Sequence, residues 1–207
     1  LLLADSETSY AKHDAFDLKK GDREAAATHF SNTGVGAFIT TRPYGVAASM
    51  NEQPRDIFVN GIQSGPLNGD LATQLAGKGE AVQAAISALA LMTSGKVYVS
   101  HDADAAAVAE LQAEGATHIT FSGKHPKGLV GTQIAKAAPI NKGEVVWTVN
   151  AVDLPIIGRA FLSGEYAPEY KVAVTGSKAM NTGYATMLQG VSLNGFISAN
   201  FNAENTR

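Results

Sequence analysis

The sequence predicts an α/β fold in which a mostly parallel sheet is covered by helices and is followed by a smaller β-rich domain. From about residue 35 to residue 150, short apolar and β-branched runs alternate with segments of helical periodicity. This alternation is typical of a parallel sheet with helices on its faces. After Ser163 and Gly164 the composition changes to glycine and asparagine with short apolar runs. We therefore expect two domains, at 1–168 and 169–207.

Four strands of the buried type are expected in the first domain. Each is a short run of β-branched and aromatic residues that ends at turn residues. A further apolar run, "GAFITTRPYG", is broken at Arg42-Pro43. In the second domain, "YKVAVTGS" predicts a strand that ends in a glycine turn. The four strands of the first domain are expected near 56–61, 96–100, 117–121 and 145–149.

Helical segments are expected between these strands. Residues 80–94 place apolar side chains at the spacing of one buried helix face. Asp102 is expected to cap a helix over 103–115. Pro155 stands near the start of an apolar helical segment, where proline is tolerated. The remaining candidates are 24–30, 128–139, which stops at Pro139 and is a helix or a turn, and 152–166.

The composition excludes several classes of protein. The chain has 207 residues, 45% hydrophobic and 17% charged, with a net charge of −3, so nothing favours a nucleic-acid partner. There is no apolar run of the ~20 residues that cross a bilayer. Cysteine is absent, which excludes disulfides, zinc–thiolate sites and cysteine-held iron–sulfur clusters. The start "LLLADSET" lacks a methionine and signal-peptide features, so we interpret the chain as an excised fragment or a trimmed ordered region.

The segment "VNGIQSGPLNGD", residues 59–70, is the most ligand-like part of the chain. A strand that ends in a glycine-rich loop is where α/β proteins hold nucleotides and flavins. The alternative is an ordinary turn in which glycine supplies a positive φ. The G-x-G-x-x-G and Walker A patterns are absent. The residues alone leave both interpretations open.

No catalytic or metal-binding residue is predicted. None of the five histidines has a histidine four residues away, so a histidine metal site is not expected. The chain has no G-x-S-x-G elbow. The carboxylates are scattered and form no acid–base pair. Trp147, in "VVWTV", is expected to lie in the core.

Three blocks carry a resemblance to a known family. They are "TTRPYG…DIFVNGIQSGPL" (40–67), "KHPKGLVGTQI" (124–134) and "VVWTVNAVDLPIIGRAFLSGEY" (145–166). In this order, they resemble the A subunit of the bacterial sodium-translocating NADH:quinone reductase, over about residues 20 to 200. The long pattern W-x-x-N-x-x-D-[VL] is the most specific part. It is formed here by Trp147, Asn150, Asp153 and Leu154. Where the family usually has Thr-His-Ile-His, this chain has Thr132, Gln133, Ile134 and Ala135.

The resemblance implies a Rossmann-like domain followed by a partial ubiquitin-like β-grasp domain of the SLBB type. Both resemble the flavin-carrying subunit of respiratory complex I. It also implies a peripheral subunit on the cytoplasmic face of the bacterial inner membrane. Its partners would be the other subunits of the sodium pump, which would carry FMN, FAD, riboflavin and the iron–sulfur centres. This chain would be a structural and quinone-associated subunit with no cofactor of its own, inactive when isolated.

Two alternative functions for this chain belong to other classes of protein. One is an FMN- and NADH-binding subunit of a complex I-like or ferredoxin-linked electron-transport complex. Those relatives have cysteine clusters and a glycine-rich flavin loop, and this chain has neither. The other alternative is a free-standing nucleotide-binding module, which would need a phosphate motif.

The loop after the first long strand also resembles the flavin loop of complex I relatives, N-A-D-E-G-E-P-G. The aspartate and the two glutamates of that loop correspond here to Ile62, Gln63 and Gly65. Asn60 and Pro66 are retained and are expected to keep the backbone shape. The resemblance therefore implies a flavin loop that has lost its charged groups, with no FMN site and no NADH site.

A quinone site is expected near this loop and the segment around Arg42. Arg42 offers donors to a quinone carbonyl, and Tyr44 offers a ring and a hydroxyl. In the competing interpretation, Arg42 pairs with a carboxylate and Tyr44 packs against its neighbours. The candidate residues are Arg42, Tyr44, Asn60, Gln63, Ser64, Pro66 and Leu67.

Overall fold

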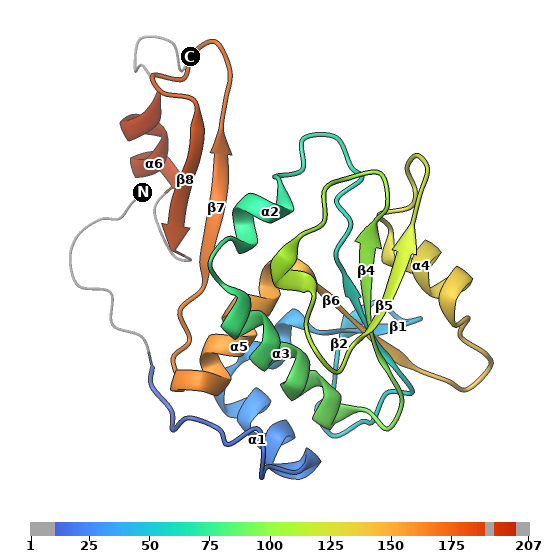
Figure 1. Ribbon diagram of the computed structural model, residues 1–207. Helices are drawn as coiled ribbons and strands as arrows, with labels where there is room; N and C mark the ends of the chain where they lie inside the picture. The colour runs from blue at the N-terminus through green and yellow to red at the C-terminus, as the bar shows by residue number, and fades with distance from the viewer. Residues whose placement is uncertain (1–10, 189–192, 202–207) are drawn as a thin grey trace. The chain divides into compact units, whose positions relative to one another are not determined.

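The structure is a computed structural model that describes residues 11–188 and 193–201 (Figure 1). The described chain divides into two compact units. The larger unit comprises Ala11–Tyr166, and the smaller one contains the last two strands and the last helix. Each unit is described by itself.

The larger unit is built on a six-stranded sheet with the order β2-β1-β6-β3-β4-β5. The strands β6, β3, β4 and β5 run parallel, while β1 is antiparallel to both β6 and β2. All four predicted strands are present, and β5 has the predicted bounds. The strands are β1 (Thr40–Arg42), β2 (Val46–Ala47), β3 (Ile57–Asn60), β4 (Val97–Asp102), β5 (Thr117–Phe121) and β6 (Val146–Asn150).

Helices cover both faces of this sheet. In Figure 1, α1, α3 and α5 lie together on one side, and α4 lies on the other. The helices are α1 (Arg23–Thr33), α2 (Leu71–Leu75), α3 (Gly79–Met92), α4 (Val130–Ala137) and α5 (Leu154–Ser163). Short 3₁₀ turns are η1 (Val35–Phe38), η2 (Ala109–Leu111) and η3 (Ala151–Asp153).

The helices α3 and α5 pack closely because a glycine lies between them. A Cβ added to Gly158 of α5 would lie 1.7 Å from the carbonyl oxygen of Ala81 in α3. Pro155 occupies the first turn of α5, as predicted. Gly164 ends the helix in the left-handed conformation, with φ 69°.

Aromatic side chains fill the core on either side of the sheet. Phe30 of α1 packs edge-on against Phe161 of α5, with ring centroids 4.7 Å apart. On the face that α4 covers, Phe58 contacts Ile134 and stacks on Tyr98. Trp147 of β6 is fully buried, which confirms its predicted place in the core.

The predicted helix over 103–115 is wrong. Only the three-residue η2 forms there, and β4 continues to Asp102, which is paired with Phe121. Ala103 then donates its N–H to the Phe121 carbonyl at 2.9 Å, which keeps the chain extended beside β5. The Asp102 carboxylate accepts the Asp104 N–H at 2.9 Å and pairs with Lys127. It therefore closes a local turn rather than capping a helix.

In its described residues, the smaller unit contains an antiparallel hairpin and one helix. The strand β7 (Glu169–Val174) pairs with β8 (Gly183–Leu188), and α6 (Leu193–Asn200) follows. The helix lies in a segment for which the sequence indicates only β structure. The predicted fold class, a mostly parallel α/β sheet followed by a small β-rich domain, is confirmed, and the strands described in that second part form an antiparallel sheet. The domain boundary near residue 168 stays a prediction.

Candidate functional site

In open α/β sheets, ligands bind at the carboxyl ends of the strands, at the point where the strand order reverses. Here the chain runs from β3 outward to β4 and β5, and then returns through α4 to β6 on the other side of β3. The reversal therefore lies between β3 and β6. Asn60 and Asn150, the last residues of these strands, are register partners. A flavin would enter at this position.

The protein's own side chains occupy this position. Gln133 of α4 is fully buried, and its Nε2 donates to Asn60 Oδ1 at 2.8 Å and to the Lys127 carbonyl at 3.0 Å. Asn60 donates from Nδ2 to the Gly128 carbonyl at 3.0 Å and accepts the Ile62 N–H at 3.2 Å. Asn60 thus ties the loop to the start of α4. The cavity left beside Asn60 has a volume of about 110 Å³.

Ser64 makes a second tie between the loop and α4. Its Oγ accepts the Gly128 N–H at 2.9 Å and lies 3.1 Å from His125 Nδ1. A Cβ at position 128 would lie 2.4 Å from this Oγ, so only glycine fits there. Ser64 is therefore part of the loop's anchorage.

The loop glycines do not supply a positive φ. None of the glycines in 60–70 is among the residues with left-handed backbone, whereas Leu67 has φ 64°. Gly61 is required for another reason, because a Cβ there would lie 2.2 Å from the Ser100 carbonyl oxygen. Close packing against β4 therefore explains the glycine at position 61 better than a turn with positive φ does.

Arg42 lies between two cavities. One is the small space beside Asn60, and the other has a volume of about 330 Å³ with largely apolar walls. Within residues 11–188 and 193–201, Arg42 has no carboxylate partner, and its Nε is buried without a hydrogen bond. The walls of the larger cavity are Arg42, Pro43, Gly131, Ile134, Ala135, Pro139 and Ile140.

The other predicted quinone residues do not line these two cavities. Tyr44 is 73% exposed and Leu67 is 98% exposed, so neither packs against a neighbour. Pro66 is also exposed, and Gln63 lines a third cavity. The structure thus brings Arg42 and Asn60 together, places Ser64 beside them and leaves the remaining four apart.

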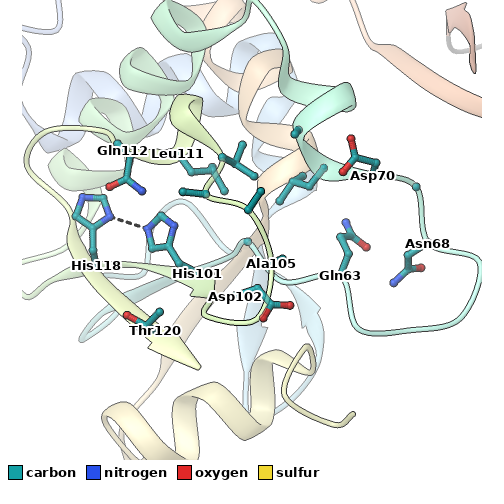
Figure 2. A pocket seen from close by; sticks show the side chains of 17 residues that line it. Gln63, Asn68, Asp70, His101, Asp102, Ala105, Leu111, Gln112, His118 and Thr120 are labelled. Atoms are coloured by element: carbon teal, nitrogen blue, oxygen red, sulfur yellow. Dashed lines mark hydrogen bonds between the residues drawn. The ribbon is translucent and has the colours of Figure 1, made fainter. Parts of the chain in front are cut away.

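The third cavity, about 480 Å³, lies at the carboxyl ends of β3, β4 and β5 (Figure 2). Its side chains include a histidine pair that sequence reasoning missed. His101 Nε2 lies 2.8 Å from His118 Nδ1, and His118 Nε2 lies 3.1 Å from the Ala113 carbonyl oxygen. The two histidines come from neighbouring strands, so a search for helical spacing cannot find them. Within the described part of the chain, no three potential ligands gather to hold a metal ion.

An ion-pair cluster lies beside this cavity. Lys127 Nζ binds Asp102 Oδ1 and also lies 2.8 Å from Asp104 Oδ2. These hydrogen bonds raise the pKa of Lys127. The Lys127 hydrogen bond, followed by that of the Gly123 N–H, lowers the pKa of Asp104. Lys127 and Asp104 are therefore charged at neutral pH. The cluster holds the loop after β4 against the segment before α4.

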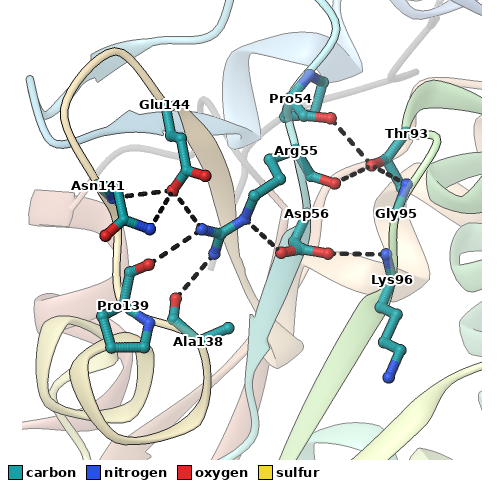
Figure 3. Close-up of polar contacts among 10 residues, drawn as sticks. All are labelled: Pro54, Arg55, Asp56, Thr93, Gly95, Lys96, Ala138, Pro139, Asn141 and Glu144. Atoms are coloured by element: carbon teal, nitrogen blue, oxygen red, sulfur yellow. Dashed lines mark hydrogen bonds and ion pairs between the residues drawn. The ribbon is translucent and has the colours of Figure 1, made fainter.

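A second polar network, at the amino end of β3, has a structural role (Figure 3). Arg55 donates to Asp56 at 2.7 Å, to the Ala138 carbonyl at 2.8 Å and to the Pro139 carbonyl at 2.9 Å, and it pairs with Glu144. Asp56 Oδ1 also accepts the Lys96 N–H at 2.8 Å. Because its groups satisfy one another, this network offers no free group to a ligand.

Comparison with known proteins places the chain in a family. A family model described as the NqrA second alpha/beta domain matches residues 21–166. Three relatives, each named as the A subunit of a Na(+)-translocating NADH-quinone reductase, come from Teredinibacter turnerae (33% identical over 89% of this chain), Yersinia pseudotuberculosis (30% over 92%) and Marinomonas sp. (28% over 98%).

The matches cover 41%, 42% and 45% of these relatives, respectively, so the chain spans less than half of their length. The family model alone covers more than half of this chain. The resemblance predicted from the three sequence blocks is confirmed, and the chain belongs to the family of the second α/β domain of NqrA, the A subunit of the sodium-translocating NADH:quinone reductase.

Proposed function

We propose that this chain serves in the NqrA subunit of a sodium-translocating NADH:quinone reductase as a structural and quinone-associated part that carries no flavin of its own. The observation that carries the proposal is the carboxyl edge of β3 and β6. Gln133 and Asn60 are hydrogen-bonded to each other there and leave only a small cavity. Beside it lies an apolar cavity with a guanidinium that has no carboxylate partner in the described ranges.

The size of the space argues against a flavin. Pockets that hold drug-sized ligands measure roughly 300–1,000 Å³. The cavity at the strand reversal measures about 110 Å³, and Asn60, which lines it, is held by a hydrogen bond from the buried Gln133. The complex I loop also brings three carboxylates, each worth roughly 1.5–3 kcal/mol in a charged hydrogen bond. Their counterparts here are Ile62, Gln63 and Gly65, none of which carries a charge.

The cavity beside Arg42 suits a quinone ring. Its volume of about 330 Å³ is at the lower end of the range for small ligands, enough for a head group whose tail extends outside. Ile134, Pro139 and Ile140 offer an apolar wall, and Arg42 offers N–H donors to a carbonyl oxygen. Quinone carbonyls are uncharged acceptors, so a guanidinium without a carboxylate partner and an apolar wall match both parts of the molecule.

The partners in this proposal are the other subunits of the pump, which carry the flavins and iron–sulfur centres and pass electrons to quinone. The chain is then peripheral, on the cytoplasmic face of the bacterial inner membrane. None of the helices in the described ranges is long and apolar enough to cross a membrane. Purification of the native complex through an affinity tag on this chain tests the assembly. Recovery of the chain without membrane subunits would contradict it.

Titration of the purified chain with FMN is expected to give no saturable quenching of flavin fluorescence at micromolar concentrations. The same sample is expected to show no oxidation of NADH by quinone, because it has no electron carrier. A Gln133→Gly variant, which removes the buried amide beside Asn60, is titrated with FMN in the same way for comparison. Saturable FMN binding by the unaltered chain would contradict the proposal, because it would show that a flavin can bind this chain.

A photoreactive short-chain quinone, added to the complex, is expected to label α4 or the segment around Arg42. An Arg42→Leu variant is expected to reduce this labelling about tenfold, because it removes the only cation among the described residues of the cavity wall. Tyr44→Phe is the matched control, since its exposed hydroxyl lies outside the cavity. Labelling confined to other subunits, or equal labelling of both variants, would remove this chain from the quinone site.

A further inference from the structure

The cavity at the carboxyl ends of β3, β4 and β5 is separate from the proposed quinone site and shares no lining residue with it. Its volume of about 480 Å³ is that of a small-molecule pocket. One wall is formed by small side chains of the loop after β4, Ala105, Ala106, Ala107 and Val108, with Leu111 behind them. Such a wall leaves room for a flat ring.

The histidine pair gives this cavity a defined hydrogen-bonding character. The Ala113 carbonyl can only accept, so His118 Nε2 must carry the proton that it receives. In the uncharged pair, His118 Nδ1 is then an acceptor, and His101 Nε2 must donate to it. His101 Nδ1 is thereby left with a lone pair and no hydrogen. Burial and the neighbouring His118 lower the pKa of His101, which favours the uncharged form of His101 at neutral pH.

The charged groups that line the cavity disfavour a phosphate. Among the described residues that line it there is no lysine or arginine. Its carboxylates are those of Asp70 and Asp102, and Asp102 pairs with Lys127, which does not line the cavity. The Asp70 carboxylate accepts hydrogen bonds from Thr73, which lower its pKa, so it is ionised at neutral pH. A ligand that carries a phosphate would be repelled. A ligand that donates N–H or O–H groups would find acceptors.

We propose that this cavity binds an uncharged, planar heteroaromatic ligand with ring N–H or amino donors, of the nucleoside class and without a phosphate. His101 Nδ1 accepts a donor of the ring. The amides of Gln63 and Gln112 and the hydroxyl of Thr120 provide further partners around the cavity (Figure 2). The inference does not depend on the proposed quinone site, because the two cavities have different walls.

Nuclear magnetic resonance of the full 207-residue chain tests this proposal, with adenosine and AMP as probes. Adenosine is expected to bind saturably and to shift the Nδ1 resonance of His101 and the backbone amides of Gln63, Gln112 and Thr120. AMP is expected to bind at least tenfold more weakly, because its phosphate meets the Asp70 carboxylate and no lysine or arginine among the described residues that line the cavity. Before ligand is added, the resonances of the ring nitrogens at pH 8 are expected to show that Nε2 of His101 carries the proton.

Two variants locate the effect. His101→Phe keeps a ring but removes the acceptor, and is expected to lower the affinity for adenosine about tenfold. Thr120→Val, a change of similar volume at an exposed strand position, is expected to lower it less and to fold in any case. His13→Phe is the matched control, since His13 does not line the cavity and, among the described residues, makes no hydrogen bond with the loop that carries Gln63.

Three results would overturn the proposal. The first is the absence of any shift with millimolar adenosine, cytidine or uridine. The second is equal affinity for adenosine and AMP, which would show that the carboxylates do not select the ligand. The third is unchanged adenosine binding in both His101→Phe and Thr120→Val, which would place the binding elsewhere on the chain.

Discussion

Replacing Gly158 by alanine is expected to lower the free energy of unfolding by about 2–3 kcal/mol, and valine is expected to cost more. The new Cβ would lie 1.7 Å from the Ala81 carbonyl oxygen, a backbone atom that cannot turn aside. The helices α3 and α5 must therefore separate, and the apolar contacts between them are lost. For a chain of this length, the midpoint of thermal unfolding should fall by roughly 4–12 °C.

Gly131→Ala is the matched control for this change. Gly131 lies inside α4, and a Cβ there would meet no atom within 4 Å. Alanine at this position is expected to stabilise the protein by about 0.5–1 kcal/mol, because glycine is the poorer helix former. Circular dichroism on heating and in urea measures both variants. If the two substitutions had the same effect, the close approach of α3 and α5 would be refuted.

Replacing Arg55 by methionine is expected to lower the free energy of unfolding by about 2–4 kcal/mol. The guanidinium joins β3 to the carbonyls of Ala138 and Pro139 and to the carboxylates of Asp56 and Glu144 (Figure 3). Asp56 is only 7% exposed, so its charge would remain nearly buried with one partner fewer. Arg55→Lys is expected to recover part of the loss, since lysine keeps the charge but not the fork of donors.

A surface ion pair provides the control for Arg55. Lys20 and Asp17 lie 3.4 Å apart with side chains 86% and 52% exposed, and Lys20→Met is expected to change stability by less than about 0.5 kcal/mol. Urea titration at pH 7 compares the variants. An Arg55→Met protein as stable as Lys20→Met would show that the network does not hold the sheet to α4.

The acid dependence of stability should also report this network. Hydrogen bonds from the Asn141 N–H, and then the interaction with Arg55, lower the pKa of Glu144 from its ordinary 4.5. Near that pH the unfolded chain therefore binds more protons than the folded one, and stability falls as the pH drops through the lowered pKa. In Arg55→Met the pKa of Glu144 lies closer to 4.5, so this part of the acid-induced loss becomes smaller. An identical pH profile for both proteins would contradict the assignment.

Local patterns were sufficient for the four parallel strands and for the family, but not for β2 and β8. The run Thr117–Phe121 is bounded by turn residues, and polar and apolar side chains alternate over most of it. Its limits could therefore be predicted to the residue. The segment after Asp102 was mispredicted because its alanines favour a helix, while the contacts that keep the chain extended come from Phe121 and Lys127. Here the pairing with a distant strand outweighs the helical propensity of the alanines.

The polar networks and the candidate site residues depended even more on distant contacts. Arg55 reaches Ala138, Pro139 and Glu144, which are 83, 84 and 89 positions away in sequence. The departure from the family pattern at Gln133 could be seen in the sequence, but its hydrogen bond to Asn60 could not. His101 and His118 share a face of the sheet only because β4 and β5 are neighbours. Sequence spacing does not determine which strands become neighbours.

The position of β6 in the sheet has a consequence for synthesis of the chain. It lies between β1 and β3, yet it is the last strand of the sheet to leave the ribosome. Until then the β1–β2 hairpin has no neighbour, and the apolar strand β3 has one bare edge. The single tryptophan, Trp147, is on this last strand and is fully buried once the strand is in place. Its fluorescence therefore reports one event, the joining of the two halves of the sheet, and is silent about the pairing of β3, β4 and β5 that can come before it.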